Sequence, residues 1–238
     1  MTERPVKTPR NWRDLGPRVA SAAVMIVVGI LVIVSGHKAF EALLSIAAII
    51  GVWEFYNMAR FKSHQGGGLV TEDFYALGAY VVLFVIGLAG LWGLSLLAGP
   101  AGLFFVVSIV VATDSMGYFV GRTVGGKKFW PSVSPKKTWS GVIGGWFGAA
   151  LIAMTAVLIV RLDLFESLMI VFFAVLLSFA SQLGDIAQSS VKRRMGIKDS
   201  SNIIPGHGGV LDRFDALLAV GAVLFFLRLV TWSMWGAS

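Results

Sequence analysis

The sequence of 238 residues contains no cysteine, few charged residues and only three histidines. Without cysteine the chain forms neither disulfides nor thiolate metal sites. Cysteine usage therefore does not indicate whether its compartment is oxidising or reducing. Charged residues make up 14% of the chain, whereas a soluble domain carries roughly a quarter. With 56% hydrophobic residues and a mean hydropathy of +0.79, the composition excludes an ordinary soluble fold.

Long apolar stretches dominate the chain instead. Each is long enough to cross a hydrocarbon core of about 30 Å as a helix. The seven stretches lie at about 19–36, 39–59, 74–98, 101–121, 141–160, 167–185 and 214–235. A break inside the long third stretch would give eight spans. We therefore predict an all-α, polytopic transmembrane helical bundle of seven or eight spans, with residues 19–238 in a single membrane-embedded domain.

Positive charges lie mainly on one side of this predicted bundle. With the N-terminus inside, the cytoplasmic segments are 1–18, 60–73, 122–140 and 186–213. These segments hold 17 of the 20 Lys and Arg residues, while Lys38 and Arg161 lie on the opposite side and Arg228 lies within the last span. This asymmetry follows the positive-inside rule and predicts a cytoplasmic N-terminal tail at 1–18. The net charge of +7 is then explained by topology and anionic headgroups rather than by nucleic acid.

Glu41 lies toward the opposite end of the second predicted span, but most acidic residues within or beside the spans collect at the cytoplasmic face. Those at the cytoplasmic face are Glu54, Asp114, Asp185, Asp212 and Asp215. Ionisable groups in spans are costly and are therefore candidates for function. For Asp212 and Asp215, at a helix start, capping of free N–H groups is an equally good explanation. Asp185 lies at a helix C-terminus, where an anion is disfavoured and needs a cationic partner.

Three of these carboxylates, Asp185, Asp212 and Asp215, have no soft ligand near them in the sequence. They suit a hard cation such as Mg²⁺, which typically takes one or two carboxylates together with substrate phosphates. A lone His207 without cysteine does not suit zinc. We predict that the three aspartates bind Mg²⁺, with a second cation left open. For His207 we predict a hydrogen bond to phosphate, the alternative being an ordinary turn residue.

The basic loop at 122–140 combines five Lys and Arg residues with several hydroxyl side chains and precedes a glycine-rich helix start. Such a segment suits an anionic polyphosphate. The alternative is a positive-inside loop that contacts lipid headgroups. The stretch 121–128 approaches a P-loop pattern, but Lys128 stands where Ser or Thr is needed and no strand precedes it, so we reject a P-loop.

Polar residues also surround the predicted start of the seventh span. If the sixth helix continues inward, Asp185, Gln188, Ser189 and Lys192 lie on one helix face, which suits a metal–phosphate group. The glycine turn at 205–209 permits a close approach of the backbone, and a helix N-terminus follows it. Glycines four apart within two other spans are assigned to helix packing instead: Gly117, Gly121, Gly144 and Gly148.

A spaced pattern runs from Ser189 to Asp215. Its residues are Ser189, Val191, Lys192, Arg193, Lys198, Asp199, Ser201, Ile204, Pro205, His207, Gly208, Gly209, Asp212, Arg213, Phe214 and Asp215. This pattern resembles that of the phosphatidate cytidylyltransferase (CDP-diacylglycerol synthase) family. Two upstream segments resemble the same family: Asp114, Tyr118, Gly121 and Arg122, and the run from Ser134 to Trp139. Members often carry glutamate where this chain has Gln188 and Ser140, and we interpret both departures as variation within an active enzyme.

The resemblance implies a nucleotidyltransferase that joins CTP and phosphatidic acid, giving CDP-diacylglycerol and pyrophosphate for phospholipid biosynthesis. It makes residues 19–238 a catalytic domain with active-site segments at 114–140 and 182–215. The expected catalytic residues are Asp185, Asp212, Asp215, Lys192 and His207. The expected substrate-binding residues are Asp114, Arg122, Ser134, Lys136, Lys137, Thr138, Ser189, Arg193, Lys198, Asp199, Gly208, Gly209 and Arg213.

The expected partners are CTP, phosphatidic acid and membrane lipids, with no nucleic acid, and a homodimer is left open. The expected location is a cell membrane, of the bacterial inner-membrane type, with the site facing the cytoplasm. One alternative, a CTP-dependent lipid-alcohol kinase, would release CDP instead of pyrophosphate. The other, a transporter, would spread polar residues through the bilayer depth, whereas the acids of this chain gather at one face.

Overall fold

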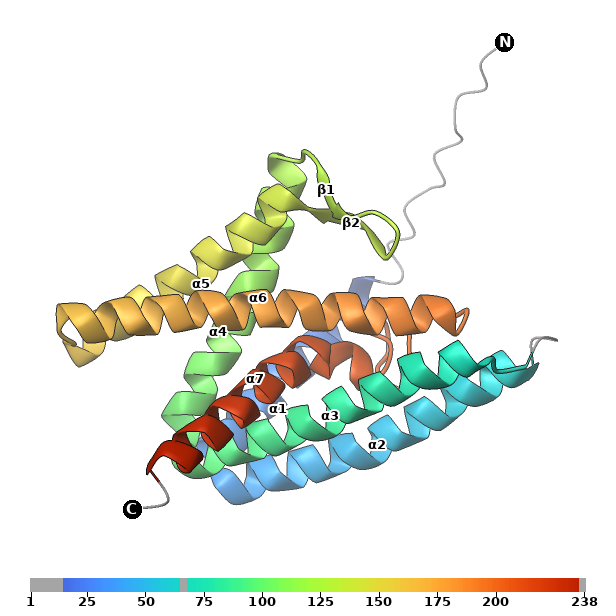
Figure 1. Cartoon of the computed structure of the whole chain (residues 1–238), viewed down its shortest axis with the longest axis horizontal. Coiled ribbons are helices and arrows are strands. Elements are labelled where there is room, and N and C mark those ends of the chain that lie inside the picture. Colours follow the sequence, from blue (N-terminus) through green and yellow to red (C-terminus); the bar gives the residue numbers. More distant parts are fainter. Residues whose placement is uncertain (1–14, 65–67, 236–238) are drawn as a thin grey trace, which may run out of the picture.

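The structure is a computed structural model that describes residues 15–64 and 68–235. In that part of the chain, seven long helices and one β-hairpin form the fold (Figure 1). The helices are α1 (Leu15–Val34), α2 (His37–His64), α3 (Thr71–Leu97), α4 (Gly99–Thr123), α5 (Trp139–Val160), α6 (Leu164–Arg194) and α7 (Leu211–Trp235). The strands are β1 (Lys128–Trp130) and β2 (Ser134–Thr138). The predicted all-α bundle is confirmed, while residues 1–14 of the predicted tail lie outside the described part.

Six of the helices, α2 to α7, are long and apolar enough to cross a membrane. The apolar part of α1, Val19–Val34, is shorter, so the count of seven spans stays a prediction. Helix α3 runs from Thr71 to Leu97 without interruption, and the alternative of a break in the third apolar stretch is therefore wrong. Many large apolar side chains on the outer faces of the helices are exposed in the isolated chain, as expected of faces that lipid covers.

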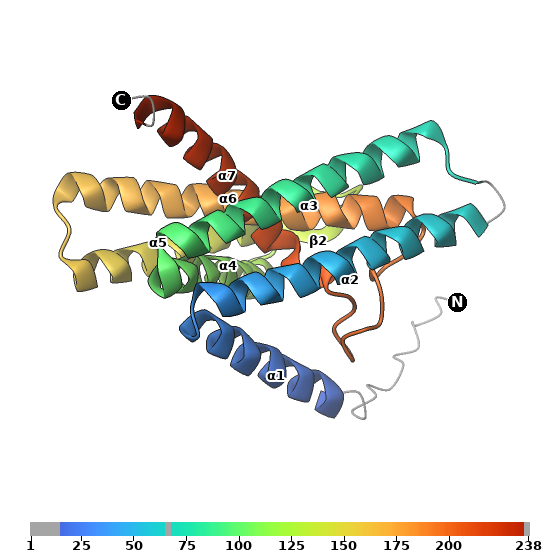
Figure 2. The same ribbon diagram turned by 90° about the horizontal axis from the view of Figure 1, so that it is seen from below.

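Helix α7 lies between α3 and α6 (Figures 1 and 2). It packs most extensively on α3 and next on α6, and α4 and α5 form another closely packed pair. Buried apolar residues of α4, α5, α6 and α7 form one core cluster, and those of α2, α3, α6 and α7 form a second. Because α6 and α7 contribute to both clusters, they join the two sides of the bundle.

The connections between helices divide between the two ends of the bundle. The β-hairpin, the α2–α3 connection and the segment between α6 and α7 lie toward one end, and the α5–α6 turn and the start of α2 lie toward the other (Figure 1). The second end carries Lys38 and Arg161. This division agrees with the uneven distribution of positive charge, and the orientation in the membrane remains a prediction.

The β-hairpin within the predicted basic loop was not expected from the sequence. Its two strands are antiparallel, and the rings of Phe129 and Trp139 meet edge to face with 4.7 Å between their centroids. Thr138 is the N-cap residue of α5, and its hydroxyl accepts a 3.2 Å hydrogen bond from the Gly141 amide. The ring contact and the cap attach the hairpin to the start of α5.

Glycines allow two helix pairs to pack backbone against backbone. A Cβ atom at Gly90 of α3 would overlap the carbonyl oxygen of Gly221 in α7, and one at Gly221 would overlap that of Gly87. The predicted packing role of the glycines in the fourth and fifth spans is also confirmed, because a Cβ atom at Gly144 would lie 2.7 Å from the Val120 Cβ atom. Small residues therefore set the spacing between α3 and α7 and between α4 and α5.

We predict that Gly90→Ala destabilises the bundle, whereas Gly78→Ala in the same helix does not. A Cβ atom at Gly90 meets the α7 backbone, which cannot move aside as a side chain can, while nothing lies within 4 Å of one at Gly78. Overpacking of this kind costs about 1–3 kcal/mol or more. Thermal unfolding of the purified protein in detergent measures the difference. Equal melting temperatures for the two variants would contradict this account of the α3–α7 contact.

The lack of cysteine allows a direct test of the orientation. We expect a cysteine introduced as Leu164→Cys, near the α5–α6 turn, to react with a membrane-impermeant maleimide on intact cells. Ser132→Cys, in the β-hairpin, should react only after the membrane is opened. The opposite labelling pattern would reverse the predicted topology.

Candidate active site

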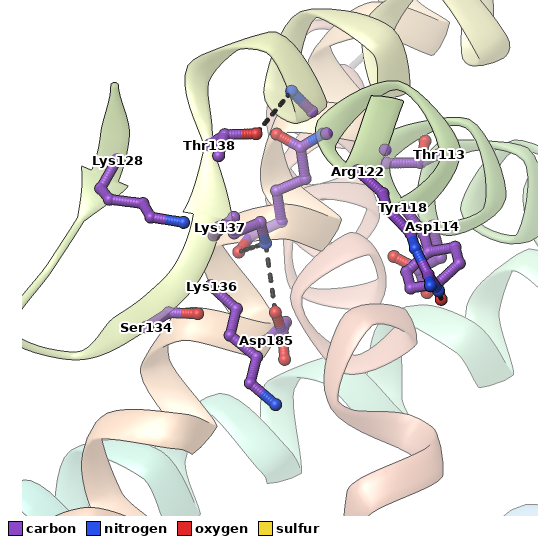
Figure 3. Close-up of a pocket in the computed structure, with 14 residues that line it drawn as sticks. Thr113, Asp114, Tyr118, Arg122, Lys128, Ser134, Lys136, Lys137, Thr138 and Asp185 are labelled. Carbon is purple, nitrogen blue, oxygen red and sulfur yellow. Dashed lines mark hydrogen bonds and ion pairs between the residues drawn. The ribbon is translucent and has the colours of Figure 1, made fainter. Parts of the chain in front are cut away.

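A cavity of about 520 Å³ lies between α4, the β-hairpin and α6 (Figure 3). Its lining residues are Thr113, Asp114, Gly117, Tyr118, Gly121, Arg122, Lys128, Ser134, Lys136, Lys137, Thr138, Gly141, Gln182 and Asp185. Seven of them were predicted as site residues: Asp114, Arg122, Ser134, Lys136, Lys137, Thr138 and Asp185. The fold thus brings the basic loop together with two of the acidic residues from the spans.

Lys137 connects the hairpin to α6 at this cavity. Its ammonium group donates to Asp185 Oδ2 at 3.1 Å and to the Gln182 carbonyl oxygen at 3.0 Å. The Lys137 side chain is 18% exposed and that of Asp185 is 45% exposed. The expected helix C-terminus at Asp185 is wrong, because α6 continues beyond it to Arg194. The expected cationic partner of Asp185 is nevertheless present in Lys137. No other side chain in the described ranges forms an ion pair or hydrogen bond with Asp185.

The α4 wall of the cavity carries Asp114, Tyr118 and Arg122 at successive turns. The Arg122 guanidinium donates to the Tyr118 hydroxyl, and its central carbon lies 5.8 Å from the centroid of the Tyr118 ring. Arg122 is consequently held beside the cavity by its neighbour on the helix. Within the described residues, Asp114 forms no ion pair, and its charge interacts with those of Asp185 and Lys137.

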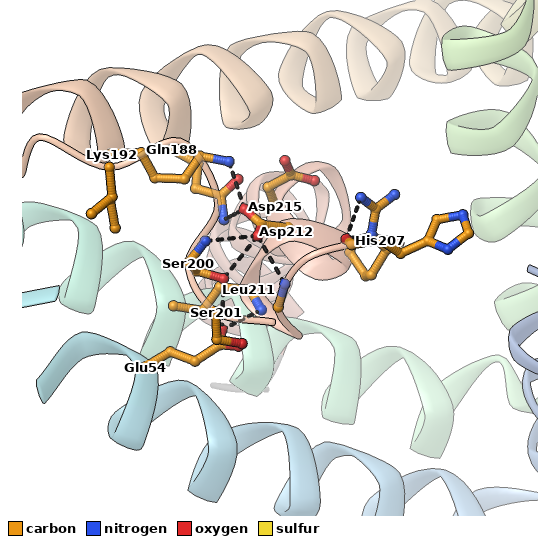
Figure 4. A network of polar contacts seen from close by, with 12 residues as sticks. Glu54, Gln188, Lys192, Ser200, Ser201, His207, Leu211, Asp212 and Asp215 are labelled. Atoms are coloured by element: carbon orange, nitrogen blue, oxygen red, sulfur yellow. Dashed lines mark hydrogen bonds and ion pairs between the residues drawn. The ribbon is translucent and has the colours of Figure 1, made fainter. Parts of the chain in front are cut away.

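Asp212, in the first turn of α7, lies in a second polar group about the start of that helix (Figure 4). It is 9% exposed. Its Oδ1 atom accepts hydrogen bonds from Lys192 Nζ and, at 3.2 Å, from Gln188 Nε2. Its Oδ2 atom accepts from the Ser200 amide at 2.8 Å, the Ser200 hydroxyl at 3.0 Å and the Gly209 amide at 2.9 Å. Both oxygens are thus engaged by groups of the protein itself.

Glu54 of α2 joins the same group from the other side, and it was not among the predicted site residues. It is fully buried. It accepts hydrogen bonds from the amides of Val210 at 2.9 Å and Leu211 at 2.8 Å, and from the hydroxyls of Ser200 and Ser201. Its position near the cytoplasmic end of a predicted span was a signal of this role in the sequence.

The carboxylates of Asp212 and Glu54 explain why positions 208 and 209, directly after His207, require glycine. Gly208 has a φ of 80°, and a Cβ atom there would lie 2.6 Å from Asp212 Oδ2. A Cβ atom at Gly209 would overlap Glu54 Oε1. Only glycine lets the backbone approach both carboxylates this closely. The predicted contact of Gly208 and Gly209 with substrate stays a prediction.

The His207 turn is also tied to α1. His207 Nδ1 lies 2.7 Å from the Ser21 hydroxyl, which donates to the Pro205 carbonyl oxygen at 2.9 Å. Arg213 donates two hydrogen bonds, of 2.7 and 3.0 Å, to the His207 carbonyl oxygen. The turn is therefore held from α1 and from α7 at once.

The remaining predicted residues lie outside the cavity. Ser189 is half-buried on α6, and Arg193, Lys198 and Asp199 are exposed at and beyond its end. The α6 helix continues to Arg194, which confirms that Asp185, Gln188, Ser189 and Lys192 share one continuous helix. Of these four, Gln188 and Lys192 bind Asp212, while Asp185 binds Lys137.

The predicted magnesium ligands are not gathered into one cluster. Within residues 15–64 and 68–235, no group of three or more His, Cys, Asp or Glu side chains is arranged to hold a metal ion. In the part of the chain that the structure describes, Asp215 accepts a hydrogen bond only from the Ala216 amide, at 2.8 Å, and its charge interacts with that of Asp185. Asp185 and Asp215 thus retain carboxylate oxygens without a protein donor. Such a pair fits Mg²⁺ that is bound by one or two carboxylates and by substrate phosphates.

Comparisons with known proteins indicate the family of the chain. Residues 79–231 match the model of the cytidylyltransferase family. A phosphatidate cytidylyltransferase of Brucella abortus is 39% identical over 216 residues, which cover 87% of this chain and 72% of the relative. Proteins of the same name from Bacillus subtilis and Rickettsia bellii are 42% and 43% identical, over 54% and 50% of this chain and 48% and 54% of the relatives.

We predict that Asp212→Asn lowers the stability of the protein far more than Asp215→Asn. The first substitution leaves the ammonium group of Lys192, whose side chain is 12% exposed, without its carboxylate. Removing one member of a buried ion pair costs about 3–5 kcal/mol. Asp215 has a single hydrogen bond to lose. Thermal unfolding in detergent compares the variants, and similar melting temperatures would contradict the structural role given to Asp212.

Proposed function

The chain belongs to the cytidylyltransferase family, and from this membership we propose that it transfers the cytidylyl group of CTP to phosphatidic acid. The products are CDP-diacylglycerol, for phospholipid biosynthesis, and pyrophosphate. Within the structure, the observation that carries the proposal is the cavity where the lysine-rich hairpin meets Asp114 and Asp185 at one end of an apolar helix bundle. A water-soluble nucleotide and a lipid phosphate can meet at such a place.

The reaction needs positioning and charge neutralisation more than it needs a strong base. An oxygen of the phosphatidic acid phosphate attacks the α-phosphorus of CTP, and the bond from the α-phosphorus to the bridging oxygen of the β-phosphate breaks. Pyrophosphate carries away the electron pair of that bond. Phosphate monoesters are already anionic nucleophiles, so catalysis consists of in-line alignment and stabilisation of the spreading negative charge.

The hairpin supplies cations for the triphosphate. Lys128, Lys136 and Lys137 all line the cavity, with Arg122 on the opposite wall (Figure 3). Lys137 is anchored by Asp185, so its charge is already in place before a nucleotide binds. We assign these cations to the phosphates of CTP, and the hydroxyl of Ser134 to a hydrogen bond with the same group.

The turn at 205–209 and the start of α7 suit the lipid phosphate. A helix N-terminus favours an anion. His207 is held by Ser21 at its Nδ1 atom, and in the imidazolium form its Nε2–H can donate to a substrate oxygen. Arg213 fixes the main chain of the same turn. We place the phosphate of phosphatidic acid between this turn and the cavity.

Asp185 and Asp215 are the residues that would hold Mg²⁺ when the substrates are bound. When bound there, it would neutralise negative charge on the reacting phosphates. Asp212 as a direct ligand and a second cation remain predictions. The chain's own contribution is to hold Asp185 beside Lys137 and to place Asp215 one turn beyond the anchored Asp212.

The two departures from the family pattern have partners in the structure. Gln188 donates to Asp212 Oδ1, a bond that an ionised glutamate cannot make. The Ser140 hydroxyl donates to the Gly125 carbonyl oxygen within the hairpin segment. Both residues thus support the same elements that carry the site, which agrees with an active enzyme. We place this site on the cytoplasmic side of a bacterial inner membrane, in keeping with the predicted charge asymmetry.

The proposal is tested by incubating purified protein with α-labelled CTP, phosphatidic acid and Mg²⁺. We expect labelled CDP-lipid and pyrophosphate in equal amounts. Asp215→Asn should lower turnover by about 100-fold or more, since it removes charge at the reacting phosphates. Glu166→Gln, an exposed acid near the opposite end of α6, is the control and should retain turnover. Release of CDP together with a phosphorylated lipid would contradict the proposal and indicate a lipid kinase. Ion flux in the absence of CTP would contradict it and indicate a transporter.

A further inference from the structure

Glu54 lies in a part of the chain that the family match leaves out. The match begins at residue 79, whereas α2 ends at His64. Yet the Glu54 carboxylate reaches the polar segment between α6 and α7, about 150 residues later in the chain. It contacts both Ser200 at one end of that segment and Leu211 at the other (Figure 4).

The charge of Glu54 has no cationic side chain as partner within the described ranges. Its oxygens instead accept hydrogen bonds from two backbone amides at the start of α7 and from the Ser201 hydroxyl, and they share the single proton of the Ser200 hydroxyl with Asp212. Burying a carboxylate is costly unless it is hydrogen-bonded in this way, and a helix N-terminus adds a favourable dipole. Because all four donors belong to residues 200–211, the cost of burying Glu54 is offset only when this segment is in place.

Ser200 links Glu54 to Asp212. Its hydroxyl lies 3.0 Å from Glu54 Oε2 and 3.0 Å from Asp212 Oδ2, and its amide donates to Asp212. Asp212 in turn binds Lys192 of α6. A continuous polar path therefore runs from α2 through the turn to α6, and Asp215 lies one helical turn after Asp212 on α7.

We propose that Glu54 is a positioning residue for the transfer reaction. It holds the 200–211 segment so that His207 and Asp215 face the phosphates, and it makes α2 part of the active site. The proposal deepens the proposed function and rests on it for its kinetic part, while its structural part is testable without any activity.

The variant Glu54→Gln keeps the size of the side chain and removes its charge. We expect kcat per folded molecule to fall by about 10- to 100-fold, as for other groups that orient site residues. The KM for CTP should change little, because the hairpin lysines that line the cavity are untouched. The matched control is Asp73→Asn in α3, which removes a carboxylate that is also buried, paired with Arg194 at the same end of the bundle, and absent from the cavity. It should retain kcat per folded molecule.

Hydrogen–deuterium exchange supplies the readout that is independent of activity. Glu54→Gln should speed exchange of the Val210 and Leu211 amides, whereas Asp73→Asn should speed exchange at Val70, whose amide binds Asp73. If Glu54→Gln does not fold, Ser201→Ala removes one donor and should show the same pattern with a smaller kinetic loss.

Three outcomes overturn the positioning role: unchanged exchange at residues 200–211, unchanged kcat in Glu54→Gln, or an equal loss of kcat in Asp73→Asn. Absence of CDP-lipid synthesis by the unaltered protein would instead reject the proposed function. The exchange measurement would then still decide whether Glu54 holds the segment.

Discussion

Two buried carboxylates, Glu54 and Asp212, hold the start of α7 in place, and the architecture of the candidate site depends on this contact. The chain between α6 and α7 is polar and irregular, yet it packs against helices of a membrane bundle. Backbone amides that are buried there from water need acceptors from the protein. The carboxylates accept from the amides of Ser200, Gly209, Val210 and Leu211 and so meet this requirement. The absence of side chains at Gly208 and Gly209 makes the approach sterically possible.

Helix α6 connects this anchored turn to the cavity. Asp185 binds Lys137 of the hairpin, and Lys192, two turns further along, binds Asp212 of α7. Seven residues of α-helix span about 10 Å, which is a distance that one nucleotide triphosphate and a lipid phosphate can bridge. Since α6 belongs to both core clusters, the spacing between the two polar groups is set by the packing of the whole bundle.

The division of roles among the acidic residues follows from their partners. Asp212 and Glu54 are surrounded by donors of the protein and stabilise the fold of the site. Asp114, Asp185 and Asp215 each retain carboxylate oxygens without a donor among the described residues, and their charges act on one another. A reaction between two polyanions benefits from this arrangement when a cation is bound with the substrates.

The sequence by itself determined the membrane class, the seven helices and the residues of the family pattern. These follow from local properties: the length of apolar stretches, the sidedness of Lys and Arg, and the spacing of polar residues from Ser189 to Asp215. The inward continuation of α6 was only a condition in the sequence argument, and the structure extends the helix to Arg194.

Only the tertiary structure decided which polar groups meet. Glu54 and its donors are about 150 residues apart, and neither periodicity nor charge indicates such a pairing. The β-hairpin could not be predicted from the sequence either, because its position depends on the Phe129–Trp139 contact and on the cap at Thr138. The sequence identified Asp212 and Asp215 as one pair, whereas the fold separates them, since only Asp212 lies within reach of Ser200, Gly209 and Lys192. Hydrogen-bond partners over such separations are a property of packing, and packing exists only in the folded chain.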